Sequence, residues 1–64
     1  MTRKRATVVK TEYVDGKRTS LVDNFEYEHV RVHDGFCVYI DTTNKTSVTY
    51  SIDIIESIYV EVVS

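Results

Sequence analysis

The sequence predicts an all-β domain, a small antiparallel meander of five or six strands. Valine, isoleucine, threonine and tyrosine dominate its 64 residues, whereas the helix formers alanine and leucine occur once each, as Ala6 and Leu21. Both glycines follow an aspartate, and Asp-Gly between alternating apolar residues is a strong hairpin signal. The chain has no proline and no internal repeat, which indicates one continuous domain.

Turn residues divide the first two thirds of the chain into strands. Asp15-Gly16 and Asp34-Gly35 are the expected tips of two hairpins, because this dipeptide accepts the positive φ of a tight turn. A third turn is expected over the polar residues 42–45. The predicted strands span residues 5–14, 17–23, 25–33, 36–41 and, after the third turn, a segment around 48–50.

The register of the second hairpin is open to two interpretations. A two-residue loop pairs Phe36 with His33 and places Glu28 beside Asp41, whereas a three-residue bulged loop pairs Phe36 with Val32. The second arrangement sets Phe36 and Val38 opposite the apolar residues Val32 and Val30. We therefore expect the bulged loop, with the even-numbered positions of this hairpin facing the core.

A change of face is predicted in the middle of the segment 25–33. Phe25 and Tyr27 have odd numbers, but Val30 and Val32 have even numbers, so the strand must switch faces near Glu28 and its neighbour. A β-bulge or a sharp bend would achieve this, and such bends curl short sheets into barrels.

The C-terminal third predicts a strand, a short helical turn near residues 53–57 and a last strand near 58–63. Val48 and Tyr50 alternate with polar residues, Ile55 and Ile58 are spaced by three, and the alternation then resumes. Residues 50–60 thereby resemble the end of SH3-like and Sm-like small barrels, in which a one-turn helix joins the two closing strands. The resemblance implies an SH3-like barrel over residues 6–64. An OB-like barrel and an open sheet completed by a partner chain are the alternatives.

Charge and cysteine content exclude several classes of protein. The net charge is −2, and without Arg3, Lys4 and Arg5 the chain holds 5 basic against 10 acidic residues. We expect residues 1–5 to form a basic flexible tail, and the acidic remainder to repel a phosphate backbone.

The single cysteine, Cys37, excludes a disulfide-stapled scaffold. With no apolar run of about 18 residues and no signal sequence, a cytoplasmic protein is expected.

The sequence offers no catalytic or metal-binding pattern. His29 and His33 share a face of a strand, but residues four apart in a strand are separated by about 13 Å, too far for both to bind one metal ion. In the expected register His29 and His33 lie only diagonally from Cys37, and no oxyanion-hole loop or deep pocket is expected, so we expect a spectator cysteine on a partly covered face. No phosphate-binding loop, dinucleotide fingerprint or nucleophile elbow is present. The protein is therefore expected to be a non-enzyme without a cofactor.

Tyrosines that the odd-even alternation places on the outside of the sheet predict a contact surface instead. Phe25, Phe36 and Tyr50 have core phase, as does Tyr27, whereas other tyrosines are expected to point outward, where they often mark interfaces. The candidate interface residues are Tyr13, Arg31, His33, Tyr39, Tyr59 and Val63. The last strand is apolar on both faces and so should be covered by a second copy or another protein.

These observations predict a non-enzymatic binding module that self-associates and occupies a surface of a partner macromolecule. In size and composition the chain resembles compact accessory and inhibitor proteins of bacteriophages, which implies an inhibitor or anti-defence role. One alternative is a small barrel that binds single-stranded nucleic acid, with tyrosines stacking on bases. Its phosphate contacts would come from Arg3, Lys4, Arg5, Lys17 and Arg18. Another alternative is a protein that sequesters a small nucleotide at a subunit interface through Arg31, His33 and tyrosines.

Overall fold

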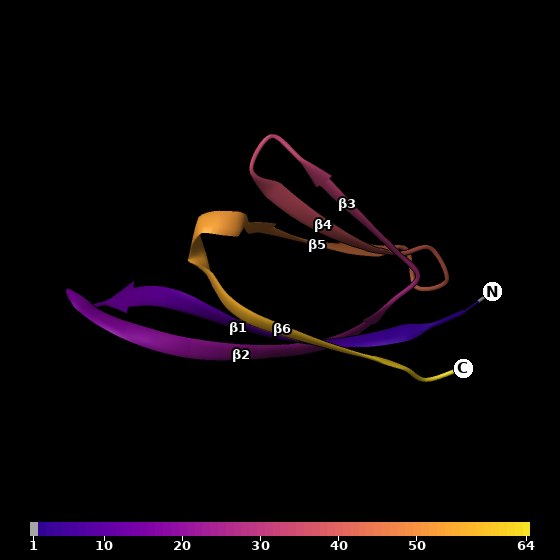
Figure 1. Ribbon diagram of the computed structural model, residues 1–64, viewed down its shortest axis with the longest axis horizontal. Coiled ribbons are helices and arrows are strands. Elements are labelled where there is room, and N and C mark those ends of the chain that lie inside the picture. Colours follow the sequence, from indigo (N-terminus) through magenta and orange to yellow (C-terminus); the bar gives the residue numbers. More distant parts are fainter. Residues whose placement is uncertain (1) are drawn as a thin grey trace.

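The computed structural model describes residues 2–64 as two three-stranded antiparallel sheets (Figure 1). The first sheet has the strand order β2-β1-β6 and the second has the order β3-β4-β5. The elements are β1 (Lys4–Val14), β2 (Lys17–Tyr27), β3 (His29–His33), β4 (Phe36–Asp41), β5 (Thr46–Ser51), the 3₁₀ helix η1 (Ile52–Ile54) and β6 (Ile55–Val62). The predicted all-β class with antiparallel pairing is confirmed, but the strand order is not a simple meander, because β6 returns to pair with β1.

The two sheets do not join into a closed barrel within residues 2–64. Each strand pairs only with neighbours in its own sheet. The long β1–β2 hairpin extends to one side in Figure 1, and the molecule is elongated, with extents of 42 × 24 × 18 Å. The closure into an SH3-like barrel thus remains a prediction. The same part of the chain contains no helix with the length and apolar character needed to cross a membrane.

Both Asp-Gly pairs lie at hairpin tips, as expected, and each forms a two-residue turn. Val14 pairs with Lys17 across the first turn and His33 pairs with Phe36 across the second. The φ values are 52° and 76° in the first turn and 48° and 79° in the second. Two successive left-handed residues define a type I′ turn, whose twist matches that of the strands. The predicted third turn also forms, between Asp41 and Thr46, which pair across it.

The bulged register expected for the second hairpin is wrong. Because Asp34 itself adopts a positive φ of 48° next to Gly35, the turn closes with two residues and needs no third. Val32 consequently pairs with Cys37, and every side chain of β4 faces the side opposite to the predicted one. Phe36, expected in the core, is 49% exposed, whereas Cys37 is buried and not on a partly covered face.

The predicted change of face occurs at Glu28. This residue separates β2 from β3, which belong to different sheets, and its backbone N–H donates to the carbonyl oxygen of Ile40 (2.9 Å). Tyr27 and Glu28 are both buried although they are neighbours in sequence. The bend therefore carries the chain from the first sheet to the second.

The basic N-terminal segment is part of the first sheet, so the expectation of a flexible tail over residues 1–5 is wrong for residues 3–5. β1 begins at Lys4, which pairs with Tyr27 on one side and Val62 on the other. Beyond this pair, the backbone N–H of Val63 donates to Arg3 O (3.0 Å). The β1–β6 ladder reaches Arg3 because β6 extends to Val62 and Val63 continues the pairing. Met1 lies outside the described residues.

The core lies between the sheets and is largely aromatic. Its buried apolar residues are Ala6, Val8, Tyr27, Cys37, Tyr39 and Tyr50, with Phe25, Val48 and Ile55 packed around them. The ring of Tyr39 lies at the centre, 4.8 Å from that of Tyr27 and 5.0 Å from that of Phe25, measured between centroids. Tyr39 is 4% exposed, so its predicted outward orientation is wrong for the same reason as the register of β4.

A β-bulge in β6, and not a helix, accounts for the spacing of Ile55 and Ile58. Val9 pairs with Ser57 but Lys10 pairs with Ile55, which leaves Glu56 as an extra residue. Both isoleucines therefore lie on the inner side of the sheet. The expected helical turn exists, but as the shorter η1, immediately before β6.

Candidate functional site

The outward side of the second sheet presents three ordered rows of side chains. Side chains that pair across antiparallel strands point to the same side of a sheet. The row on β3 is His29, Arg31 and His33. The row on β4 is Phe36, Val38 and Ile40, and the row on β5 is Ser47, Thr49 and Ser51. We call these residues the outer face.

The outer face is open and apolar along its middle. Phe36 is about half exposed, and Val38 and Ile40 are partly exposed. The side chain of His33 is 84% exposed. A shallow depression beside these rows is lined by Arg31, Val32, His33, Val38 and Ile40. Such a surface fits a broad contact with another macromolecule and does not enclose a small substrate.

The three rows contain no carboxylate, although the chain has 10 acidic residues. Arg31 supplies a permanent positive charge in the middle of the β3 row. Asp34, at the adjoining turn, lies 3.0 Å from His33, measured from Oδ2 to Nε2. The outer face is therefore neutral to cationic in an otherwise acidic protein, and a charge of this sign is complementary to an anionic surface.

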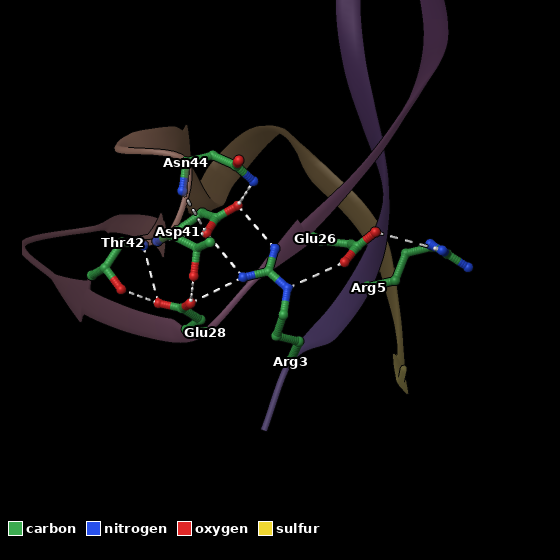
Figure 2. A network of polar contacts seen from close by, with 8 residues as sticks. Arg3, Arg5, Glu26, Glu28, Asp41, Thr42 and Asn44 are labelled. Carbon is green, nitrogen blue, oxygen red and sulfur yellow. Dashed lines mark hydrogen bonds and ion pairs between the residues drawn. The ribbon is translucent and has the colours of Figure 1, made fainter. Parts of the chain in front are cut away.

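A network of acids around Arg3 lies where the N-terminal strand, the bend and the third turn meet (Figure 2). The Arg3 Nη1 atom donates to Glu28 Oε2 (2.9 Å) and Asp41 Oδ1 (3.1 Å), and Nη2 donates to Asp41 Oδ2 (3.0 Å). The Nε atom donates to Glu26 Oε1 (3.3 Å). The side chains of Glu28 and Asp41 are only 3% and 6% exposed. Their charges are stable there because the guanidinium fork pairs with both.

The third turn saturates the remaining oxygens of this network. Glu28 accepts hydrogen bonds from the backbone N–H of Thr42 (3.0 Å) and from the hydroxyls of Thr42 and Thr43. These hydroxyl bonds hold the pKa of Glu28 at about 2. Asp41 accepts from Asn44 Nδ2 (2.8 Å), and the bonds from Arg3 and Asn44 hold the pKa of Asp41 well below its usual range. The network thus serves to join three segments and has no free ligand position.

The same network explains why the second hairpin adopts the two-residue register, which the pairing of apolar residues had disfavoured. Glu28 does lie beside Asp41, as the two-residue loop requires, but Arg3 sits between the two carboxylates and pairs with both. An arrangement that looks repulsive in the hairpin alone is stabilised by a residue more than twenty positions away in sequence.

The basic residues proposed as phosphate contacts do not form one surface. Arg3 is engaged in the acidic network, and Arg5 lies 3.2 Å from Glu61 and 3.7 Å from Glu26. Lys17 and Arg18 lie at the opposite end of the β1–β2 hairpin from Lys4, about 30 Å away along the strand. Their spread and their acidic partners leave no continuous cationic track for a nucleic acid backbone.

The predicted interface residues fall into separate groups. Tyr13 and Tyr59 are exposed, at 71% and 67%, as expected, but Tyr13 lies near the first hairpin tip and Tyr59 on β6, where partly exposed Val63 follows. Arg31 and His33 belong to the outer face. A second shallow depression separates the first hairpin from η1, and it is lined by Thr11, Glu12, Tyr13, Arg18, Asp53 and Ile54.

Phe36 is the site residue that the pattern of the sequence missed. The available signal was the Asp-Gly pair itself, which occurs at both hairpins and accommodates the same two-residue turn in each. No protein family, curated protein or solved structure matches the chain.

Proposed function

We propose that the protein is a non-enzymatic binding module that self-associates and occupies an acidic surface of a partner protein with its outer face. The exposed ring of Phe36 between the basic row of β3 and the hydroxyl row of β5 carries this proposal. Aromatic and arginine side chains contribute most of the affinity at protein interfaces. Covering a partner's surface is a direct route to inhibition, so the phage-type inhibitor or anti-defence role forms part of the proposal.

The strand order supports an SH3-like arrangement as the scaffold of this module. In our proposal the bent β2–β3 segment is shared between the two sheets, and η1 joins the two strands that would close the barrel.

Replacement of Phe36 by alanine is expected to weaken partner binding at least ~10-fold, because an exposed aromatic anchor in an interface contributes a large share of the affinity. The partner is first captured from the native host, and its dissociation constant is then measured by calorimetry with purified proteins. Arg31→Ala should weaken binding in the same way. Val22→Ala, at an exposed valine of the first sheet, is the control and should bind like the wild type. Unchanged affinity in both outer-face variants would contradict the proposal.

Single-stranded nucleic acid binding is the second candidate, and the outer face favours it more than the basic N-terminus does. A base could stack on Phe36 while Arg31 contacts a phosphate. In this case labelled single strands should bind in fluorescence anisotropy, with an affinity that falls only about 2- to 3-fold between about 50 and 200 mM salt, because Arg31 contacts a single phosphate. Phe36→Ala should abolish the binding. The absence of binding at the lower salt concentration would eliminate this candidate.

A further inference from the structure

Strand β6 has one edge without a partner and carries exposed apolar side chains along it. Its other edge pairs with β1, and no strand within residues 2–64 pairs with the free edge. Ile58 is 42% exposed, Val60 44% and Val62 68%. These three residues pair with Val8, Ala6 and Lys4, so they lie on the inner side of the sheet. The second sheet covers Val8 and Ala6 completely but leaves the stripe on β6 open.

The other strands at sheet edges carry polar protection that β6 lacks. β2 begins with Lys17 and Arg18, β3 carries Arg31 between two histidines, and β5 is rich in serine and threonine. Charged and polar residues of this kind discourage pairing with another chain. Between residues 58 and 62, β6 has a single charge, Glu61, and neither lysine nor proline.

The hydrogen-bond ladder shows which backbone groups point to the free edge. The N–H of Val63 donates to Arg3 O across the β1–β6 pair (3.0 Å). Antiparallel strands alternate between residues that bond to the neighbour and residues that bond away from it. The backbone groups of Ile58, Val60 and Val62 therefore point away from β1. The residues with exposed apolar side chains are also those with unpaired donors and acceptors.

We propose that two copies of the chain pair through β6 in antiparallel orientation about a two-fold axis at Val60. This inference rests on the self-association in the proposed function and names the strand that produces it. Val60 pairs with Val60 of the partner subunit, and Ile58 pairs with the partner's Val62. Each pair exchanges both of its N–H···O bonds, and the two sheets become one continuous sheet.

The sequence of β6 is self-complementary in this register. When the strand Ile-Tyr-Val-Glu-Val is reversed against itself about Val60, apolar residues meet apolar residues on the inner side and Tyr59 meets the partner's Glu61 on the outer side. An axis at Glu61 would place two carboxylates opposite each other. An axis at Tyr59 would place Val62 opposite the bulged Glu56. The axis at Val60 alone uses all the outward-pointing backbone groups without a clash of charge.

Val60→Lys is expected to convert a dimer into a monomer, because it places two positive charges beside each other at the axis. Sedimentation equilibrium should give twice the 7.4 kDa chain mass for the wild type and one chain mass for the variant, with a dissociation constant raised more than about 100-fold. The matched control is Val32→Lys, at a valine on β3 that is 69% exposed, and it should remain dimeric. Circular dichroism checks that both variants keep the β fold.

Amide hydrogen exchange of the wild type gives a second, variant-free measurement. The amides of Ile58, Val60 and Val62 should become protected as the protein concentration rises through the dimer range. A wild type that is monomeric at all concentrations overturns this inference and the self-association, while binding by the outer face is unaffected. A dimer in which these amides exchange freely, or in which a folded Val60→Lys variant still associates, overturns the β6 pairing alone.

Discussion

Tyr39→Ala is expected to leave most of the protein unfolded at 25 °C. Its ring lies at the centre of the core, in contact with Phe25 and Tyr27 and 6.2 Å from Tyr50 between centroids. Removal of a buried aromatic ring costs about 3–5 kcal/mol. A domain of this length has a total stability of only ~3–10 kcal/mol, so the loss of this ring removes a large part of it. Urea unfolding followed by circular dichroism measures the loss.

Two variants test whether this loss comes from the ring in the core. Tyr39→Phe keeps the ring and should retain the fold, whereas Tyr13→Ala removes a tyrosine that is 71% exposed and should change the free energy of unfolding by less than about 0.5 kcal/mol. If Tyr39→Ala were as stable as Tyr13→Ala, the inward orientation of β4 would be refuted.

Arg3→Met is expected to lower the melting temperature at pH 7 by about 10 °C or more. The substitution keeps much of the side-chain volume but removes the cation that pairs with Glu28 and Asp41, and it leaves two nearly buried carboxylates next to each other. Arg5→Met is the matched control. Arg5 is 46% exposed and its partners are exposed as well, so its loss should have little effect.

The effect of Arg3→Met should depend on pH in a defined direction. The pKa values of Glu28 and Asp41 are lowered in the folded protein, so the stabilisation from these carboxylates is present above their ordinary values near 4. It is lost as the pH falls through the folded values, to about 2 and below. Thermal melts between pH 7 and 2 should therefore show the wild type and Arg3→Met converging in acid. A constant difference across this range would contradict the role of the network.

The hairpin turns could be predicted because they depend on the residues within each turn. The register of the second hairpin could not, because it also depends on a residue far away in sequence. Asp15-Gly16 and Asp34-Gly35 determine their turns by their own backbone preferences, which the sequence displays directly. The register of the second hairpin also depends on Arg3, which is distant in sequence and reaches Glu28 and Asp41 only in the folded chain. Matching apolar residues within the hairpin could not include that contribution.

The outward position of Phe36 and the inward position of Tyr39 follow from that one shift in register. An offset of a single residue exchanges the two faces of a strand, so every assignment of inside and outside on β4 was reversed together. The bend at Glu28 was predictable because the parity of apolar positions changes on either side of it. The exposed stripe on β6 was expected from its apolar content, whereas the bulge at Glu56 could not be distinguished from a helical turn by spacing alone.

The chain passes between the two sheets at Glu28 and at η1, and these two connections are held by different numbers of polar contacts. The difference determines where the two sheets should separate first. At Glu28 the chain is clamped by ion pairs and by the third turn. At the η1 end, Ile52 N–H donates to Gly35 O (2.9 Å), which ties η1 to the second sheet, and the hydroxyl of Tyr50 donates to Asp23 Oδ2 of the first sheet (2.8 Å). A depression lies between η1 and the first hairpin, and no ion pair is found between η1 and that hairpin within residues 2–64. We expect local unfolding to separate the two sheets first at the η1 end, while the Glu28 end stays closed. Solvent should therefore reach Tyr50 before it reaches Tyr27.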